Sequence, residues 1–469
     1  MSTTIENEPI RRESSRRRPV WSMLWAPMVL VIASFAWALP LITSHSQAFS
    51  PVDEWVYYDY LAKIPEQGIV RQGEPLSEES LRLMSCTGVQ VYGPMGSRCH
   101  ASQLDPSKYP FKGITTADAY TPLYFWTTWV GAKATNALGV ESMLVAARLT
   151  SAIWLAVTMV LFYALLRTVR ANNVLIVGLG LCFIGSPAAF WTYSFVSTDA
   201  PSLAFGCAIL LAARLQVLRR ISPWWLIALS VLGTLFKVTN ILAVLCAAAY
   251  LLVYWILGVE KDSRWSVLRQ PRSWRHTGDW RLARTALYAT GASIVAQGMW
   301  LLVRRLLAVG PIAPQDFDGS FGIDALGHQL INFINGTLVS NVLIVGQSDL
   351  GYPLPDYLGR PLTWIALIGV FGILFTKAPL HGARDYDALR WSIAPSAVLL
   401  APLLATALFL TQGFFFHFPS RYGLALAASF LLMFAMLLRE KRYVNWLVLL
   451  YGLALVVWGL RYSTLPTSV

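Results

Sequence analysis

Repeated apolar runs of about 20 residues constrain this chain more than any other feature of its sequence. Three early examples cover residues 21–42, 143–166 and 174–195. A helix of this length crosses a hydrocarbon core of ~30 Å. The strands of an outer-membrane barrel would instead show alternation over ~10 residues. The pattern therefore predicts an all-α polytopic membrane protein.

Composition supports the same class. The chain has 469 residues, of which 56% are hydrophobic and 13% are charged, whereas soluble proteins carry about 25% charged residues. This excludes a soluble enzyme, a disordered chain and a secreted disulfide scaffold. The net charge is +12, but Lys and Arg in membrane proteins report topology first. No basic run belongs to a nucleic-acid-binding fold, so no nucleic acid partner is expected.

Basic residues set the expected orientation. Five arginines lie within residues 1–20, directly before the first apolar run, which predicts a cytoplasmic basic tail and a cytoplasmic N-terminus. Later basic clusters follow every second span, so about eleven spans are expected, with the C-terminus outside. The expected spans are 21–42, 143–166, 174–195, 201–218, 223–235, 240–257, 285–306, 361–379, 391–411, 422–438 and 444–461.

Residues 21–469 are expected to form a single transmembrane domain with two long extracytoplasmic loops, 43–142 and 307–360. The first loop is rich in Trp, Tyr and Pro, which favours ordered structure. Its segment 120–138 is apolar but contains Lys133, so we interpret it as a juxtamembrane helix with aromatic side chains at headgroup depth. Cys86 and Cys99 lie in this loop, where a disulfide is permitted and would add ~3 kcal/mol.

Ionisable residues gather at the predicted outer ends of the spans. Charges near a membrane are costly unless they line a wet or paired site, so each is a functional candidate. Together they predict a polar cavity that opens toward the outer face. These residues are Asp53, Glu54, Arg148, Asp199, Lys237, Arg304, Arg305 and Arg421.

Each of these acids has two interpretations. Asp53 follows Ser50 and Pro51, so it either completes a helix cap or acts as a general base at the membrane surface. Adjacent residues do not share a helix face, so only one of Asp53 and Glu54 should point into the site. Asp199 precedes Pro201 and is likewise either a cap or part of the same polar site.

The cations also have two interpretations. Lys237 lies between two short spans and either snorkels to the interface or binds a phosphate as a compact charge. Arg421 opens an inward span, where a guanidinium either contacts headgroups or holds a phosphate through two parallel hydrogen bonds. Arg304 and Arg305 run against the positive-inside trend, which weakens a purely topological role for them.

The sequence contains no spacing of histidines that is typical of a metal site. It also contains no Gly-rich phosphate loop after a strand, so an ATP or nucleotide-sugar site is not expected. No cofactor is therefore required by the sequence, and a divalent cation would have no recognisable ligand motif.

Several of these residues occur in a familiar order. The Asp53-Glu54 pair opens the first outer loop, and the segments 122–124 (PLY) and 147–152 (ARLTSA) follow, then Asp199, Lys237 and Arg421-Tyr422. In this layout the chain resembles the GT-C superfamily of integral-membrane glycosyltransferases. That superfamily includes protein O-mannosyltransferases, the aminoarabinose transferase of lipid A and mycobacterial arabinofuranosyltransferases. The frequent His-Pro-Pro of the family is replaced here by residues 120–122 (YTP), which leaves the subfamily open.

The resemblance implies a function. It implies transfer of a sugar, with inversion, from a polyprenyl-phosphate donor to a glycan, glycolipid or protein acceptor on the outer face of the cell membrane. Asp53, or else Glu54, would be the base, and cations would hold the donor phosphate. Lys237, Arg421, Arg304 and Arg305 are the candidates for the phosphate, whereas Asp199, Tyr57, Tyr124 and Arg148 would support the site or contact the acceptor.

A transporter or a lipid or glycan flippase is the alternative. Such a protein predicts ionisable groups near the middle of the membrane and two repeats with broken helices. In this sequence the charges lie toward one side, and no convincing repeat is present.

Overall fold

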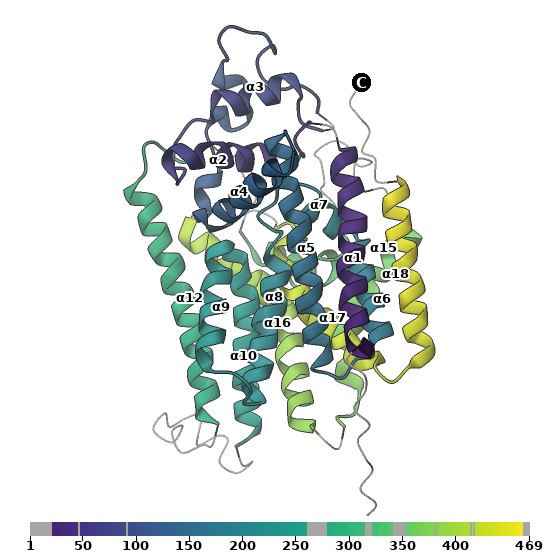
Figure 1. Ribbon diagram of the computed structural model, residues 1–469. Coiled ribbons are helices and arrows are strands. Elements are labelled where there is room, and N and C mark those ends of the chain that lie inside the picture. The colour runs from purple at the N-terminus through teal and green to yellow at the C-terminus, as the bar shows by residue number, and fades with distance from the viewer. Residues whose placement is uncertain are drawn as a thin grey trace, which may run out of the picture.

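The apolar runs form a helical bundle in this computed structural model, which describes residues 21–45, 47–90, 92–259, 279–314, 321–340, 352, 354–379, 382–412, 415 and 418–462. In Figure 1 the long helices run alongside one another, and α2, α3 and α4 gather over one end. We call this end, formed by residues 47–90 and 92–142, the cap end. The opposite end, where α1 begins and α17 ends, is the far end. The predicted basic tail, residues 1–20, lies outside the described residues, as do 260–278, 315–320 and 341–351.

The α-helices of the described chain are α1 Trp21–Ser44, α2 Glu54–Gln67, α3 Glu78–Cys86, α4 Pro122–Ala137, α5 Met143–Arg167, α6 Asn173–Ile184, α7 Pro187–Tyr193, α8 Ser202–Val217, α9 Pro223–Phe236, α10 Ile241–Leu257, α12 Trp280–Leu306, α13 Ile323–Gln329, α14 Asn332–Gly336, α15 Asp356–Leu367, α16 Ala383–Gln412, α17 Leu424–Leu438 and α18 Arg442–Tyr462.

Eight described helices are long and apolar enough to cross a membrane. The number becomes nine if α6 and α7, which meet at 65°, form one broken span. All eleven expected segments contain helix, but α8 and α9 contain only 16 and 14 residues. At 1.5 Å per residue each is shorter than a hydrocarbon core. The count of eleven is therefore not shown by helix length.

Local sequence explains where several helices begin. Ser142, Asn172 and Ser186 each accept a hydrogen bond from the backbone N–H three residues later, which caps α5, α6 and α7. Pro187 follows Ser186 at the first position of α7. A proline there suits a new helix but cannot continue the old one, so the span bends.

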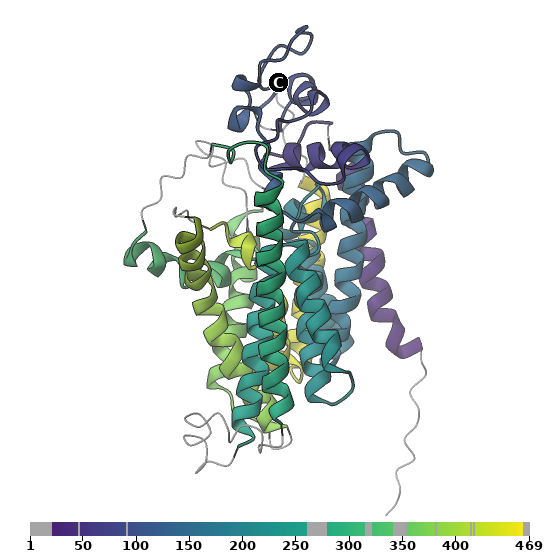
Figure 2. The same ribbon diagram turned by 90° about the vertical axis from the view of Figure 1, so that its left-hand side faces the viewer.

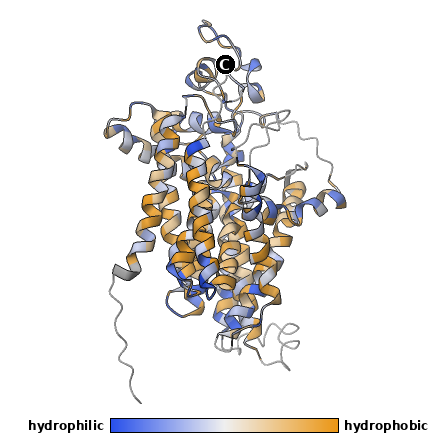
Figure 3. Ribbon diagram, turned by 90° about the vertical axis from the view of Figure 1, so that its right-hand side faces the viewer, coloured by the Kyte–Doolittle hydropathy of each residue, from blue (hydrophilic) through white to orange (hydrophobic). Residues whose placement is uncertain are grey.

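The middle of the bundle is apolar, and both ends are more polar (Figure 3). One connected core of buried side chains runs through it, with α18 packed on α6 and α1 packed on α5. On α12, Ile294, Val295 and Met299 are each more than half exposed. Exposed apolar side chains in this band are suited to lipid.

Residues 47–90 and 92–142 fold over the bundle as short helices and turns (Figure 2). The segment 120–138 contains α4, which packs on α2 and α5. A disulfide joins Cys86 to Cys99, so the end of α3 is tied to the following loop. The backbone N–H of Val309 donates to the carbonyl of Gln72 over 3.0 Å. The segment that follows α12 is therefore attached to the cap.

Candidate functional site

Four ionisable side chains from four separate parts of the chain meet near the cap end. Lys237 Nζ donates to Asp199 Oδ1 over 2.5 Å. Arg421 Nε lies 3.6 Å from Asp199 Oδ2, and Arg421 Nη2 lies 3.8 Å from Asp53 Oδ2. We call Asp53, Asp199, Lys237 and Arg421 the charge cluster. Two acids and two cations make it neutral when all four are ionised.

Asp53 occupies the N-cap position of α2, but its side chain reaches the cluster instead of capping the helix. It precedes α2 in a left-handed conformation, with φ 53°, and its side chain makes no capping hydrogen bond. Non-glycine residues rarely adopt this conformation, although aspartate tolerates it better than most. The capping interpretation of Asp53 is therefore wrong, and its carboxylate is directed elsewhere.

Asp199 is similarly released from capping. Helix α8 begins at Ser202, and no side chain caps it, so the interpretation of Asp199 as a cap is also wrong. Its side chain is 5% exposed and that of Lys237 is 3% exposed. A buried lysine and a buried aspartate need each other, because either charge alone is costly away from water.

Lys237 occupies a break between two helices. Helix α9 ends at Phe236, Lys237 is extended with φ −156° and ψ 129°, and a short 3-10 turn, η4 Val238–Asn240, leads into α10. The hydroxyl of Thr121, which caps α4, donates to the carbonyl of Leu235 just before this break. The cap and the broken helix are therefore joined beside the cluster.

Arg421 lies on η9, Ser420–Gly423, just before α17. Helix α14 supports this turn: Thr337 Oγ1 donates to the carbonyl of Ser420 over 3.1 Å. The contact requires glycines, since a Cβ on Gly336 would collide with the Ser420 side chain and one on Gly423 would collide with Thr337 Oγ1. Arg421 Nε is buried and has no hydrogen-bond acceptor among the described residues.

Three tyrosines surround the cations. Lys237 Nζ lies 5.3 Å from the ring centre of Tyr422 and 6.0 Å from that of Tyr120. Tyr57 donates to the Tyr120 hydroxyl over 3.2 Å and accepts from Thr198 over 3.3 Å. Burial raises the pKa of both Tyr57 and Tyr120 above the usual tyrosine range, so both hydroxyls stay protonated.

The surroundings of Asp53 favour its neutral form. Desolvation by the enclosing chain raises the pKa of the Asp53 carboxyl, while Arg421 and Lys237 act in the opposite direction and Asp199 adds to the rise. A carboxylate with a raised pKa is a better proton acceptor than an ordinary aspartate.

Glu54 has a different role from its neighbour. It is fully buried and paired with Arg148, also fully buried, through contacts of 2.8 Å to Nε and 2.7 Å to Nη2. The backbone N–H groups of Ser50 and Val196 donate to the same carboxylate over 2.6 and 2.8 Å. This pair connects the start of α2 with α5 and the segment before α8, and it holds Asp53 in place.

The other predicted residues lie outside the charge cluster's direct contacts. Arg304 pairs with Asp118 over 2.6 Å, and Arg305 is exposed. Tyr124 is fully buried, with its ring against Phe125. Sequence reasoning placed the cluster's four charges at one end but did not assign Tyr120, Thr198 or Tyr422 to the site. Thr198 and Tyr422 adjoin Asp199 and Arg421, and Tyr120 opens the segment 120–122, and no other signal marked them.

The cluster can hold an anion and accept a proton. Lys237 uses one of its three N–H donors on Asp199, and Arg421 keeps its Nε without an acceptor in the described chain. Across the described ranges, no three His, Cys, Asp or Glu side chains are grouped to share a metal ion. No model of a known protein family matches the chain, and no curated protein matches it either.

Proposed function

We propose that the protein is an inverting glycosyltransferase of the GT-C type, which moves a sugar from a polyprenyl phosphate to an acceptor hydroxyl on the extracytoplasmic face. The observation that carries this proposal is the convergence of Asp53, Asp199, Lys237 and Arg421 from four separate parts of the chain at one end of the bundle. A transferase of this kind needs one base and a group of cations near the membrane surface, and the cluster offers both.

The proposed reaction balances as a single displacement. The acceptor hydroxyl gives its proton to a carboxylate oxygen of Asp53, and its oxygen bonds to the anomeric carbon from the face opposite the phosphate. The bond from that carbon to the phosphate oxygen breaks, and its electron pair leaves with the polyprenyl phosphate. Lys237 and Arg421 stabilise the developing negative charge. A phosphate needs little protonation to leave, so one base suffices.

The proposed topology places the cap end outside the cell. Taking α6 with α7 as one broken span, and α8 and α9 as short spans, adds three to the eight long helices and gives eleven. The positive-inside rule supports this direction, because arginines gather where spans end at the far end: Arg167, Arg170, Arg214, Arg219, Arg220, Arg384 and Arg439.

Substitution of Asp53 tests the proposal. Full-length protein in nanodiscs would be given polyprenyl-phosphate mannose or polyprenyl-phosphate arabinose, and release of polyprenyl phosphate would be measured. Asp53→Asn should lower the rate by ~10²–10⁴-fold, the usual effect of a general base. Asp105→Asn, which changes an exposed acid of the cap, is the matched control and should leave the rate unchanged. Full activity of Asp53→Asn removes it as the base, and movement of intact donor across the bilayer of sealed proteoliposomes, without cleavage, favours the flippase.

A further inference from the structure

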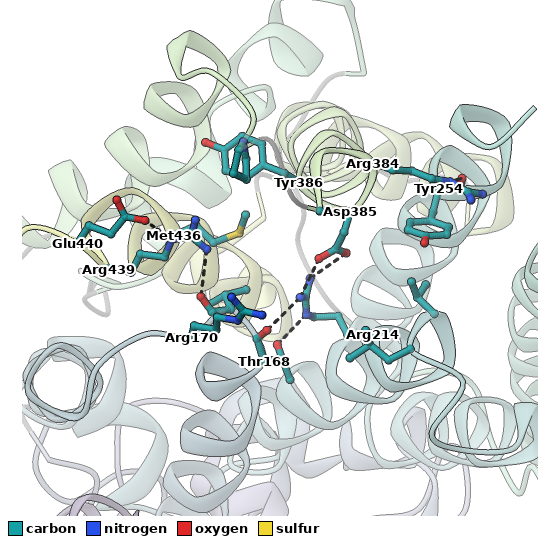
Figure 4. A pocket seen from close by; sticks show the side chains of 15 residues that line it. Thr168, Arg170, Arg214, Tyr254, Arg384, Asp385, Tyr386, Met436, Arg439 and Glu440 are labelled. Carbon is teal, nitrogen blue, oxygen red and sulfur yellow. Dashed lines mark hydrogen bonds and ion pairs between the residues drawn. The ribbon is translucent and has the colours of Figure 1, made fainter. Parts of the chain in front are cut away.

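A second polar site lies at the far end, away from the charge cluster. It is a pocket of about 750 Å³ formed where α5 and α17 end, where α8 ends, and where α16 begins (Figure 4). Tyr254 of α10 forms one wall. Nothing in the proposed transfer reaction uses this pocket.

The pocket has an excess of positive charge. Four arginines line it, Arg170, Arg214, Arg384 and Arg439, against two carboxylates. Both acids already pair with arginines of the pocket. Asp385 accepts two bonds from Arg214, over 3.1 and 3.3 Å, and one from the Tyr250 hydroxyl over 2.6 Å. Glu440 Oε1 lies 3.4 Å from Arg439 Nε, but the Glu440 side chain is 80% exposed, so this ion pair is weak.

Capping of helix ends accounts for only some of the hydrogen-bond donors of these arginines. Arg439 donates to the carbonyl of Val169, and Arg384 donates to the carbonyl of Tyr254 and pairs with Asp279 over 2.9 Å. A guanidinium has five N–H donors, so Arg384 and Arg439 each keep N–H groups that these contacts do not use. Arg170 is exposed and has no ion pair among the described residues.

One further feature suits an anion with an apolar neighbour. Three helices end at the pocket and only α16 begins there, so the attraction for an anion comes from the arginines and not from the helix termini. Arg384 is held over the Tyr254 ring at 4.0 Å, and Val169, Val217 and Met436 add an apolar side. Basic pockets at the ends of membrane helices bind lipid headgroups in this way.

We propose that the far-end pocket binds a phosphate-bearing anion through Arg170, Arg384 and Arg439, either the headgroup of an anionic phospholipid or a soluble phosphate. This site goes beyond the proposed transfer reaction and does not depend on it, since the two sites share no residue. Arg214, which is locked to Asp385 and Thr168, positions the start of α16 and is not expected to contact the anion.

Native mass spectrometry of the full-length protein tests the site. One arm adds dioleoyl phosphatidylglycerol, with net-neutral phosphatidylcholine for comparison, and the other adds inorganic pyrophosphate without lipid. Arg170→Gln and Arg439→Gln should each weaken binding about tenfold, as expected for loss of a hydrogen bond to a charged group. Arg220→Gln changes an exposed arginine of the same end outside the pocket and should bind like the unaltered protein.

The two arms separate the sources of the phosphate. Arginine-dependent binding of phosphatidylglycerol identifies a lipid headgroup site, and arginine-dependent binding of pyrophosphate alone identifies a soluble ligand. Arg170 makes no ion pair in the described chain, so Arg170→Gln should fold normally. Equal binding by Arg170→Gln, Arg439→Gln and Arg220→Gln in both arms would overturn the proposal.

Discussion

Asp53 and Glu54 are neighbours in the chain, yet their carboxylates have opposite surroundings. Glu54 is fully buried and receives four hydrogen bonds of 2.6–2.8 Å. Asp53 keeps 35% of its side-chain surface exposed, and Arg421 Nη2 lies 3.8 Å away. A carboxylate whose oxygens already accept hydrogen bonds stabilises the fold. A carboxylate whose oxygens are not all occupied can accept a proton. Substitutions at the two carboxylates and their partners should therefore affect stability and transfer differently.

The largest effect on stability is expected at the Glu54–Arg148 pair. Arg148→Gln leaves the buried Glu54 charge without its partner, which typically costs ~3–5 kcal/mol of folding free energy. The measurement is thermal unfolding of the purified protein in detergent, together with the yield of folded protein. Arg421→Gln is the comparison and should cost only about 1 kcal/mol, because its ion pairs are longer and partly exposed.

Adding Glu54→Gln to Arg148→Gln sharpens this test. The backbone N–H groups of Ser50 and Val196 donate to different oxygens of Glu54, so the single amide oxygen that this second substitution introduces can accept from only one of them, but no charge is left buried. The double variant should therefore recover part of the lost stability. Equal losses of stability in Arg148→Gln and Arg421→Gln would contradict the division between the two carboxylates.

For the rate of sugar transfer we expect the reverse ranking, with the larger effect in Arg421→Gln. Arg421→Gln should lower the rate by ~10²–10³-fold, the usual effect of removing one donor to a developing oxyanion, while the folded yield stays high. Arg421→Lys keeps the charge but loses the two parallel donors, so it should recover only part of the rate. Steady-state rates over a range of donor concentration separate loss of turnover from loss of donor binding. A normal rate in Arg421→Gln would remove it from the phosphate site.

A smaller effect is expected from pH. The raised pKa of Asp53 means that the base is lost as pH falls through that value, so transfer should drop about tenfold per pH unit below it. Stability should change in the opposite sense: the folded state favours protonated Asp53, a contribution that is present at low pH and lost as pH rises through the folded pKa. Rate–pH and unfolding–pH profiles measure the two trends.

Asp53→Asn should remove both trends. Asp105 provides a contrast, because hydrogen bonds from the side chain and the backbone N–H of Ser107 lower its pKa. Asp105→Asn should leave the acid limb of the rate unchanged. An acid limb that survives in the residual rate of Asp53→Asn would assign the titration to another group.

Local patterns made the helices predictable, because each apolar run is continuous in the sequence. They also placed Asp53, Asp199, Lys237 and Arg421 at one end, since the direction of each span follows from its flanking charges. The pairing of Glu54 with Arg148 could not be predicted, because it joins residues 94 apart and depends on how α2 packs against α5. Sequence alone could not tell which of two adjacent acids would be enclosed.

The far-end pocket could not be predicted from the sequence for a related reason. Its arginines follow spans, so their pattern was fully explained by topology, and the sequence carried no sign that Arg170, Arg384 and Arg439 meet around one space. The bend between α6 and α7 at Ser186-Pro187 was visible as a local signal, but a continuous span was expected through it. The way the helices pack against one another, which local sequence patterns do not determine, decides which residues come together in a site.

The smallest effect is expected at Arg305. Arg304 and Arg305 are adjacent, and like Glu54 and Asp53 they differ in that one is paired and the other is exposed. Arg304 pairs with the buried Asp118 over 2.6 Å, and its side chain is 16% exposed, whereas Arg305 is exposed. Arg305→Gln should change stability by no more than ~0.5 kcal/mol, as for most surface substitutions. Arg304→Gln should cost more, because Asp118 is left buried without its partner. Unfolding midpoints of the two variants, measured side by side, test this. If Arg305→Gln proves the more damaging, or if it alone abolishes donor binding, Arg305 contacts the donor and the phosphate site extends beyond the charge cluster.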